Sequence, residues 1–245
     1  MRELGRVIGR GKEAEVHAFG SRVLKLYRQG VKGSAFREAG ILAALEETGV
    51  PAPKVFGVEE HEGRWGLLME RVAGAVWAEA MLADDAAAKT HLAAMARLQA
   101  GIHARTVPAL PTQMARLKGH IGRTPLLAEP LRKRLLDALA GQRGDDRLCH
   151  GDFHPWNILG SLEAPVVIDW LDACLGVPAA DACRSYVLMV KVKPQLADAY
   201  ANAYAAAAGI ARSEIDGWLP FVAAARLAED VPEETEALIA MAERV

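Results

Sequence analysis

The N-terminal third of the chain alternates short apolar runs with polar turns, a pattern typical of antiparallel strands. Gly20-Ser21 separates the first two runs and predicts a hairpin, and the polar stretch Glu59–Gly63 is expected to form the turn between the last two. The four predicted strands are Val16–Phe19, Arg22–Leu26, Val55–Val58 and Trp65–Met69.

A helix is expected between these two pairs of strands. Apolar residues recur at helical spacing from Ser34 to Thr48, and Ser34 is a residue type that caps helix N-termini well. Gly49 and Pro51 are expected to end the helix. The predicted order is strands, helix, strands.

After Gly74 the apolar pattern becomes mainly helical. Its clearest stretch is Asp84–Ala104, and helices resume at about Asp181. Two short apolar runs, Asn157–Leu159 and Pro165–Ile168, interrupt the helices and predict a small hairpin. We therefore expect an α+β chain with a strand-rich N-terminal lobe at residues 1–73 and a mainly helical C-terminal lobe at residues 74–245.

Composition narrows the class of protein. The chain has 245 residues, of which 51% are hydrophobic, and its 29 basic and 31 acidic side chains leave a net charge of −2. This balance excludes a disordered protein and gives no support to nucleic-acid binding. No apolar run approaches the roughly 18 residues of a membrane span, and no secretory segment is evident. Three cysteines without close pair spacing are typical of a reducing compartment, so we expect a cytoplasmic protein without a membrane partner.

The densest group of reactive side chains is His150-Gly151-Asp152-Phe153-His154-Pro155-Trp156-Asn157, followed by Asp169 after the predicted hairpin. The hairpin would place Asn157 beside Asp169, and their amide and carboxylate oxygens suit Mg²⁺ bound with the phosphates of a nucleotide. Asp152 would remain free to accept a proton. This order of Asp, Asn and Asp matches the catalytic and metal-binding loops of kinases.

The stretch from His150 to Asn157 resembles the signature loop of the aminoglycoside phosphotransferase family, small-molecule kinases with a protein-kinase-like fold. The resemblance implies a two-lobed α+β fold that transfers the γ-phosphate of ATP to a hydroxyl of a small molecule. It also implies that Asp152 is the catalytic base and that Asn157 and Asp169 hold Mg²⁺.

An N-terminal segment, Gly9-Arg10-Gly11-Lys12-Glu13-Ala14-Glu15-Val16, is similar to the glycine-rich loop that covers the nucleotide phosphates in kinases. Gly9, Gly11 and Val16 would contact the cofactor there, although Ala14 replaces the third glycine of protein kinases. The missing glycine also argues against a dinucleotide-binding loop. The phosphate-binding loop of P-loop nucleotidases would need Gly at position 6 and Ser or Thr at position 13. The chain has Arg6 and Glu13 there, which argues against that loop.

Four further positions fit the same kinase frame. Lys25 lies between apolar residues on the second predicted strand and resembles the lysine that holds the α- and β-phosphates, with Glu38 of the predicted helix as its partner. The segment from Leu67 to Gly74 looks like the interlobe hinge, where the backbone at about Glu70 and Val72 would bind adenine. These assignments follow from the resemblance.

One departure distinguishes branches of the kinase superfamily. Trp170-Leu171-Asp172 follows Asp169 in place of Phe-Gly, and Ala-Pro-Glu is missing. Asp181 resembles the family's aspartate at a helix start and lies only 12 positions after Asp169, which leaves no room for a long activation loop. A small hydroxylated or amine-bearing substrate is therefore favoured. The alternatives are a nucleotide-binding pseudokinase that acts by interaction and a protein kinase.

Other interpretations of single residues stay open. Cys149, His150 and His154 form a minority candidate for a zinc site, but the two histidines are better explained as hydrogen-bonding braces of the loop. Asp172 is either a second metal ligand or a surface carboxylate. His103, at the end of a predicted helix, would favour the helix dipole.

The charge of the acceptor is undecided by sequence. Residues 112–147 hold eight basic and four acidic side chains, whereas residues 212–245 hold eight acidic and three basic ones. Acidic pockets suit polycationic aminoglycosides and a basic wall suits anions, but such runs are commonly solvated helix faces. An aminoglycoside-like antibiotic, a sugar, an amino alcohol or a related metabolite all remain candidate acceptors.

Overall fold

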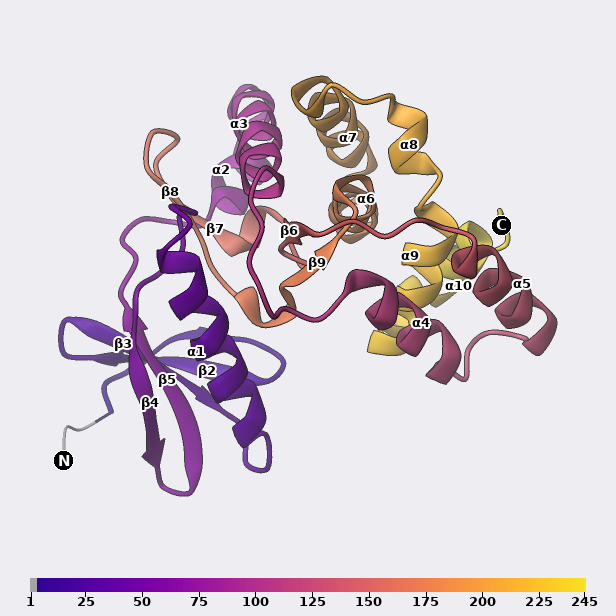
Figure 1. Cartoon of the computed structure of the whole chain (residues 1–245). Helices are drawn as coiled ribbons and strands as arrows, with labels where there is room; N and C mark the ends of the chain where they lie inside the picture. The colour runs from indigo at the N-terminus through magenta and orange to yellow at the C-terminus, as the bar shows by residue number, and fades with distance from the viewer. Residues whose placement is uncertain (1–3) are drawn as a thin grey trace. The chain divides into compact units, whose positions relative to one another are not determined.

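A five-stranded antiparallel sheet at the N-terminus is followed by a mainly helical region (Figure 1). The sequence predicts this α+β order with four of the five strands. The structure is a computed structural model that describes residues 4–245. The chain forms two compact units. The sheet unit comprises the described residues up to Trp77 together with Trp156–Leu171, and the helical unit comprises Ala78–Pro155 and Asp172–Val245.

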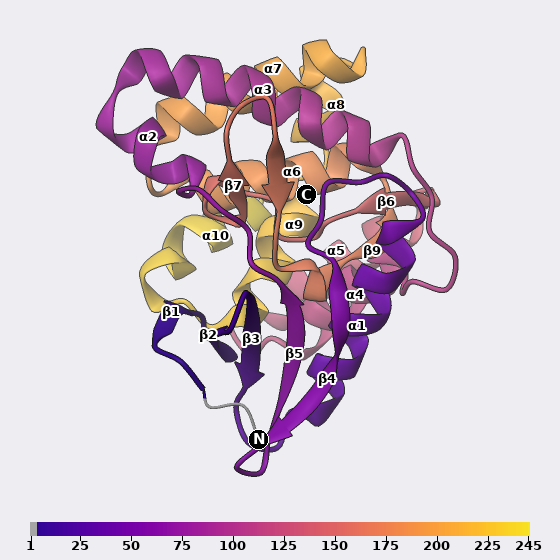
Figure 2. The ribbon, with the colours of Figure 1, turned by 90° about the vertical axis from the view of Figure 1, so that its left-hand side faces the viewer.

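The sheet has the order β1-β2-β3-β5-β4, with every neighbouring pair antiparallel. Figure 2 shows the strands in this order, from β1 at the left to β4 at the right. Their bounds are β1 Val7–Arg10, β2 Ala14–Phe19, β3 Arg22–Tyr27, β4 Val55–His61 and β5 Arg64–Glu70.

The central strand β3 is buried along most of its length because both faces of the sheet are covered there. On one face Leu24 and Leu26 join an apolar cluster with Phe19 and Leu68. Helix α1, Lys32–Glu46, contacts β3, β4 and β5 through a buried stripe of side chains. The burial of β3 therefore fixes the position of its side chains, including that of Lys25.

The predicted strands and helix are present, but several of their boundaries differ and one further strand is found. The turn between β4 and β5 is only Glu62-Gly63, both at positive φ, because a two-residue turn of this type matches the twist of the flanking strands. Ser34 is not the helix cap, since α1 begins at Lys32 and Val31 occupies the cap position without a side-chain hydrogen bond. Strand β1 was not expected, and it pairs with β2 across the glycine-containing turn.

The hairpin of β7 (Ile158–Gly160) and β8 (Pro165–Val167) belongs to the sheet unit. It is attached through backbone hydrogen bonds, including one from Val167 N to Pro51 O at 2.7 Å. Gly74 lies against Gly160 so closely that a Cβ on Gly74 would lie 2.9 Å from the Gly160 Cα. The short 3-10 helix η1, Pro155–Asn157, precedes the hairpin.

The helical unit packs long helices through small side chains. Helices α3 and α7 lie side by side (Figure 1), and buried alanines such as Ala88, Ala96, Ala197 and Ala201 permit their close approach. Its helices are α2 Trp77–Ala83, α3 Asp85–His103, α4 Gln113–Arg123, α5 Glu129–Ala140, α6 Pro178–Val190, α7 Pro194–Ala208, α8 Arg212–Asp216, α9 Leu219–Arg226 and α10 Thr235–Ala242. The 3-10 turns η2, η3 and η4 are Trp170–Asp172, Leu227–Glu229 and Pro232–Glu234.

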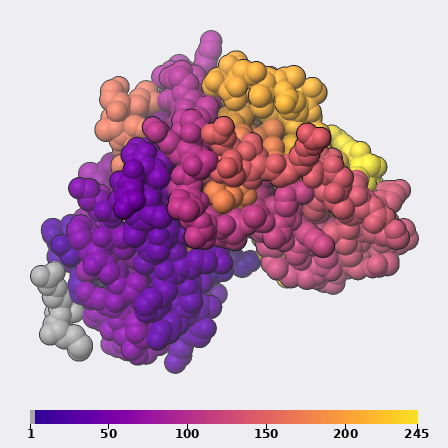
Figure 3. All heavy atoms as spheres, in the orientation of Figure 1, coloured from indigo at the N-terminus to yellow at the C-terminus, as the bar shows by residue number. Residues whose placement is uncertain are grey.

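Two short strands in the helical unit, β6 (Arg147–Cys149) and β9 (Cys174–Gly176), pair antiparallel and flank the His150–His154 loop. Residues 112–147, which carry the excess of basic side chains, form a continuous block of the surface in rose to red (Figure 3). Among residues 4–245, no helix combines the length and apolar character that crossing a bilayer requires.

Candidate functional site

Lys25 is the centre of a buried charged cluster in the sheet unit. Its position on β3 sets it opposite Val16 of β2 and Leu67 of β5. The Nζ atom donates to Glu38 Oε2 at 2.8 Å and Oε1 at 3.0 Å. It also donates to Asp169 Oδ1 at 2.7 Å. The lysine predicted to hold phosphates therefore lies between two carboxylates.

Burial and charge act in opposite directions on Lys25. Burial alone would lower the pKa of Lys25, but the negative charges of Glu38 and Asp169 outweigh it and raise that pKa above its usual value. Glu38 is 1% exposed and also accepts a hydrogen bond from the Tyr27 hydroxyl. Lys25 is therefore a permanent, oriented cation at neutral pH.

The hairpin brings Asn157 and Asp169 to adjacent positions, as the sequence predicts. The Ile168 amide donates to the Asn157 carbonyl at 2.9 Å, which extends the β7–β8 ladder by one residue. Asp169 follows directly with a positive φ of 65°. Its side chain is 46% exposed, so its carboxylate is accessible although Lys25 contacts one oxygen.

The glycine-containing turn between β1 and β2 is closed by a hydrogen bond from Gly11 N to Ala14 O at 2.9 Å. Gly9 lies opposite Val16 within the ladder. Neither glycine has a positive φ, and an added Cβ would make only ordinary contacts, the nearest at 3.6 Å for Gly9 and 3.7 Å for Gly11. Neither glycine is therefore required by the local backbone or by packing.

At the end of β5, the two positions predicted to bind adenine differ in their hydrogen bonds. The Glu70 amide donates to the Lys54 carbonyl at 2.8 Å, so this N–H is already used. Within residues 4–245 no hydrogen bond engages Val72. Of the two amides, that of Val72 is the one open to a ligand.

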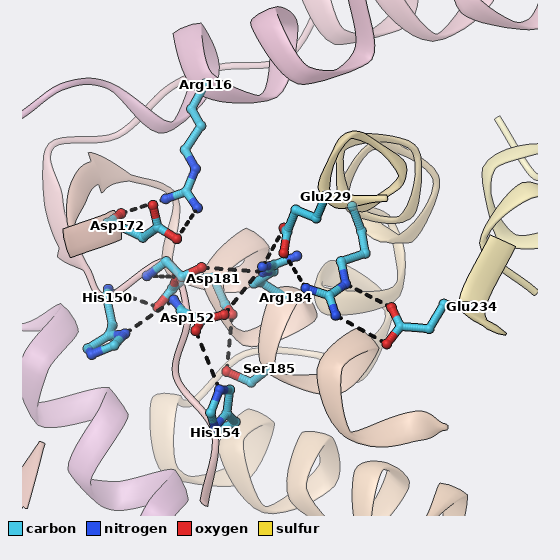
Figure 4. Close-up of polar contacts among 12 residues, drawn as sticks. Arg116, His150, Asp152, His154, Asp172, Asp181, Arg184, Ser185, Glu229 and Glu234 are labelled. Atoms are coloured by element: carbon cyan, nitrogen blue, oxygen red, sulfur yellow. Dashed lines mark hydrogen bonds and ion pairs between the residues drawn. The ribbon is translucent and has the colours of Figure 1, made fainter. Parts of the chain in front are cut away.

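Asp152 lies in a second network, within the helical unit (Figure 4). Its Oδ1 is 3.3 Å from Arg184 Nη2, and its Oδ2 is 3.4 Å from His154 Nε2. Its amide donates to His150 Nδ1 at 3.2 Å. The two histidines thus brace the loop by hydrogen bonds, as expected.

The network keeps Asp152 ionised. Burial would raise the pKa of Asp152, but the hydrogen bond from His154 and the charge of Arg184 outweigh it and hold this pKa well below its usual range. A carboxylate with so low a pKa accepts hydrogen bonds at any physiological pH and takes up a proton only transiently.

Gly151 is the one loop position where glycine is required. Its φ is +80°, and an added Cβ would lie 2.3 Å from the Asp172 carbonyl oxygen and 2.6 Å from Arg116 Nη1. Any side chain would therefore displace the backbone next to Asp152. Asp172 itself pairs with Arg116, Oδ2 to Nη2 at 2.8 Å, which makes it a structural carboxylate of the loop.

Asp181 anchors the same loop from the first turn of α6. It accepts from the Gly151 amide at 2.8 Å and the His150 amide at 3.3 Å. His103 Nε2 lies 3.0 Å from its Oδ2. Burial would raise the pKa of Asp181, but the His103 contacts outweigh it and lower this pKa to about 2. His103 lies in the last turn of α3, as expected, and is also part of a buried network.

The sequence did not indicate the residues that support Asp152 from the C-terminal side. Arg184 Nη2 lies 2.6 Å from Glu229 Oε1, and Glu229 also pairs with Arg226. Arg226 Nε in turn is 2.8 Å from Glu234 Oε2. The position of Arg184, three residues after Asp181 on one helix face, was the available signal. The distant carboxylates gave none.

Residues 6–218 match the sequence model of a family described as the phosphotransferase enzyme family. No curated protein gives a significant sequence match.

Solved structures match along nearly the whole chain. An aminoglycoside-3'-phosphotransferase of type VIII is 23% identical, covers 93% of each chain and has a TM-score of 0.65. Aminoglycoside phosphotransferase APH(3'')-Id from Streptomyces rimosus, in complex with ADP and streptomycin, is 19% identical, with a TM-score of 0.64 over 87% of this chain and 90% of that chain. A choline/ethanolamine kinase family protein from Mesorhizobium loti is 18% identical, with a TM-score of 0.62. The match covers 99% of this chain and 81% of that chain. These similarities confirm the predicted fold class.

Proposed function

Because the chain belongs to the phosphotransferase enzyme family, we propose that it transfers the γ-phosphate of ATP to a hydroxyl of a small molecule. The observation that carries the proposal is the Lys25 cluster, in which one buried cation lies between Glu38 and Asp169 at hydrogen-bonding distance. Kinases use this arrangement to hold nucleotide phosphates. The complex of APH(3'')-Id with ADP supports the nucleotide assignment.

The sheet unit would bind ATP through its backbone and Lys25. Glu38 orients Lys25 toward the α- and β-phosphates, and Gly9 and Gly11 leave the turn before Val16 free of side chains that would block a phosphate. The Val72 amide would donate to adenine, and the Glu70 carbonyl would accept from it.

Asn157 and Asp169 fit Mg²⁺, because an amide and an accessible carboxylate at adjacent hairpin positions supply hard oxygen donors. Bound there, the ion would neutralise charge on the phosphates during transfer. Asn157 is 7% exposed, so its side chain is held in place by its surroundings. Asp169 keeps its second carboxylate oxygen for this purpose while Oδ1 contacts Lys25.

Asp152 would act on the acceptor. It lies five residues before Asn157 in the sequence and is kept ionised by His154 and Arg184. An ionised carboxylate orients the attacking hydroxyl and takes its proton as the new P–O bond forms. Its lowered pKa keeps the carboxylate ionised and able to accept a hydrogen bond from the acceptor hydroxyl.

The short connection after Asp169 favours a small acceptor over a protein. Trp170–Asp172 and Cys174–Gly176 occupy this stretch, and α6 begins at Pro178. No residues remain for a long activation segment of the kind that binds protein substrates.

The proposal is tested by titrating MgATP into the purified protein and by following ATP-dependent phosphorylation of a panel of hydroxylated metabolites and aminoglycosides by mass spectrometry. We expect thermal stabilisation by MgATP and a phosphorylated product from at least one small molecule. Stabilisation without product from any class would favour the pseudokinase alternative, and robust labelling of generic proteins would favour a protein kinase.

A further inference from the structure

We propose that the helical unit binds the phosphate acceptor in a pocket beside Asp152, and that this acceptor is a small hydroxy acid whose carboxylate is held by arginine. The inference rests on the proposed phosphotransferase function and adds the chemical class of its acceptor. It follows from how the charged groups of the pocket are paired.

The pocket is formed by α4, α6, α9 and η3, all within the helical unit. Its apolar side includes Leu117 and Val222, and its polar side includes Gln113, Arg116, Arg184 and Glu229. Gly151 also borders it, and Arg184 bonds directly to Asp152. A molecule in this pocket would therefore lie next to the proposed base.

The carboxylates of the pocket wall are already paired. Glu229 gives one oxygen to Arg184 and the other to Arg226, as Figure 4 shows around Arg184. Asp181 is buried and accepts hydrogen bonds on both oxygens from Gly151, His150, His103 and Gln99. Within residues 4–245, no carboxylate of this wall is left to pair with an ammonium group of a ligand.

The donors of the wall, in contrast, are only partly used. Arg116 bonds to Asp172 through Nη1 and Nη2, and Arg184 bonds through Nε and Nη2. In the described part of the chain, Nε of Arg116 and Nη1 of Arg184 have no partner. Gln113 uses Oε1 to accept from the Val177 amide at 2.9 Å, so its amide nitrogen also keeps its donors.

This pairing decides between the two charged segments of the sequence. The basic segment 112–147 supplies Arg116 to the pocket, whereas the acidic segment 212–245 supplies Glu229, whose charge is already matched by arginines. Guanidinium groups with spare donors bind carboxylates in fixed geometry. A polycation would meet two arginines and only carboxylates that already have partners. Leu117 and Val222 suit a short carbon chain.

Matched sets of acceptors test the proposal. Each set has one carbon skeleton with a carboxylate, a hydroxyl or an amine at one end: glycerate, glycerol and 3-amino-1,2-propanediol; 4-hydroxybutyrate, 1,4-butanediol and 4-amino-1-butanol. Binding is measured by calorimetry on the full chain with a non-hydrolysable ATP analogue, and phosphorylation is measured with MgATP. We expect the acid to bind at least about tenfold more tightly than its neutral and amino counterparts in at least one set.

Arg116→Gln should remove this preference while folding normally, and Lys118→Gln is the control. Lys118 is an exposed cation two positions away on α4 that does not border the pocket. Arg116→Lys, which keeps the charge, should restore part of the preference.

The outcomes separate the two proposals. Tighter binding or faster phosphorylation of a neutral or amino member would overturn the hydroxy-acid inference and leave the phosphotransferase function intact. Acids that bind no better than their counterparts, or an unchanged preference in Arg116→Gln, would also overturn it. Acid binding without phosphate transfer from MgATP to any acceptor would support the pocket and contradict the proposed function.

Discussion

Arg184 donates from Nη2 to Oδ1 of Asp152 at 3.3 Å. The same nitrogen lies 2.6 Å from Glu229 Oε1, so the guanidinium is held between two carboxylates. Glu229 is fixed in turn by Arg226. Arg184 is therefore a positioning residue that orients Asp152 and keeps it ionised, and the C-terminal part of the chain contributes to the site through it.

Replacing Arg184 should alter the pH dependence of turnover. The folded protein depresses the pKa of Asp152, so this proposed base is ionised above that pKa and should lose activity only as the pH falls through it. Arg184→Gln removes one cause of the depression, so the acid limb of the kcat profile should move to higher pH. We expect kcat at neutral pH to fall by about 10- to 100-fold. Arg184→Lys should retain part of the depression, and an acid limb that does not move would contradict this role.

The contact between Lys25 and Glu38 should determine kcat/KM for ATP. Glu38→Gln keeps the size of the side chain and leaves Lys25 with Asp169 only. Because Lys25 would lose its orientation, we expect kcat/KM for ATP to fall by about 10- to 100-fold. Glu47→Gln, an exposed change just beyond the same helix, should leave ATP kinetics unchanged. Equal ATP kinetics in both variants would contradict the role of Glu38 in orienting Lys25 for phosphate binding.

Asp181 should make stability depend on pH. Its pKa of about 2 lies below the usual Asp value, so its contribution to the free energy of unfolding is complete above about pH 4 and is lost as the pH falls toward 2. We expect Asp181→Asn to destabilise the protein at pH 7 by about 2 kcal/mol or more. The difference from the unmodified protein should narrow at pH 3 in urea denaturation. A difference that is constant with pH would show that the Asp181 charge does not stabilise the fold.

Gly151 should not tolerate a side chain. Its positive φ and the Asp172 carbonyl 2.3 Å from an added Cβ leave no room for alanine. We expect Gly151→Ala to lower the free energy of unfolding by at least about 2 kcal/mol. Gly40→Ala, in open space on the exposed face of α1, should instead raise it by about 0.5–1 kcal/mol. Both values are measured by urea denaturation.

Local spacing predicted the features that depend on neighbouring residues. The alternation around Lys25 and the helical spacing around Glu38 predicted the strand and the helix that hold the two side chains. The hairpin pattern predicted that Asn157 and Asp169 become neighbours. In each case one face of a helix or strand is buried, so apolar residues recur in the sequence at the spacing of that element.

Contacts between distant segments left no such signal. Strands β6 and β9 are three residues each and are too short to show a periodic pattern. They are separated in sequence by the β7–β8 hairpin, so their pairing depends on the path of the chain between them. Glu229 reaches Arg184 across 45 positions, and nothing in the local sequence distinguishes it from a solvated carboxylate. Long-range ion pairs of this kind depend on packing of whole helices.

Asp152→Asn tests the proposed phosphoryl transfer most directly. The substitution preserves the size of the side chain and removes the proposed base, whereas Lys25, Asn157 and Asp169, the proposed ligands of MgATP, remain. With the best acceptor, we expect the transfer rate to fall by about 100-fold or more while the MgATP dissociation constant changes by less than about twofold. Transfer at the rate of the unmodified protein would contradict the account.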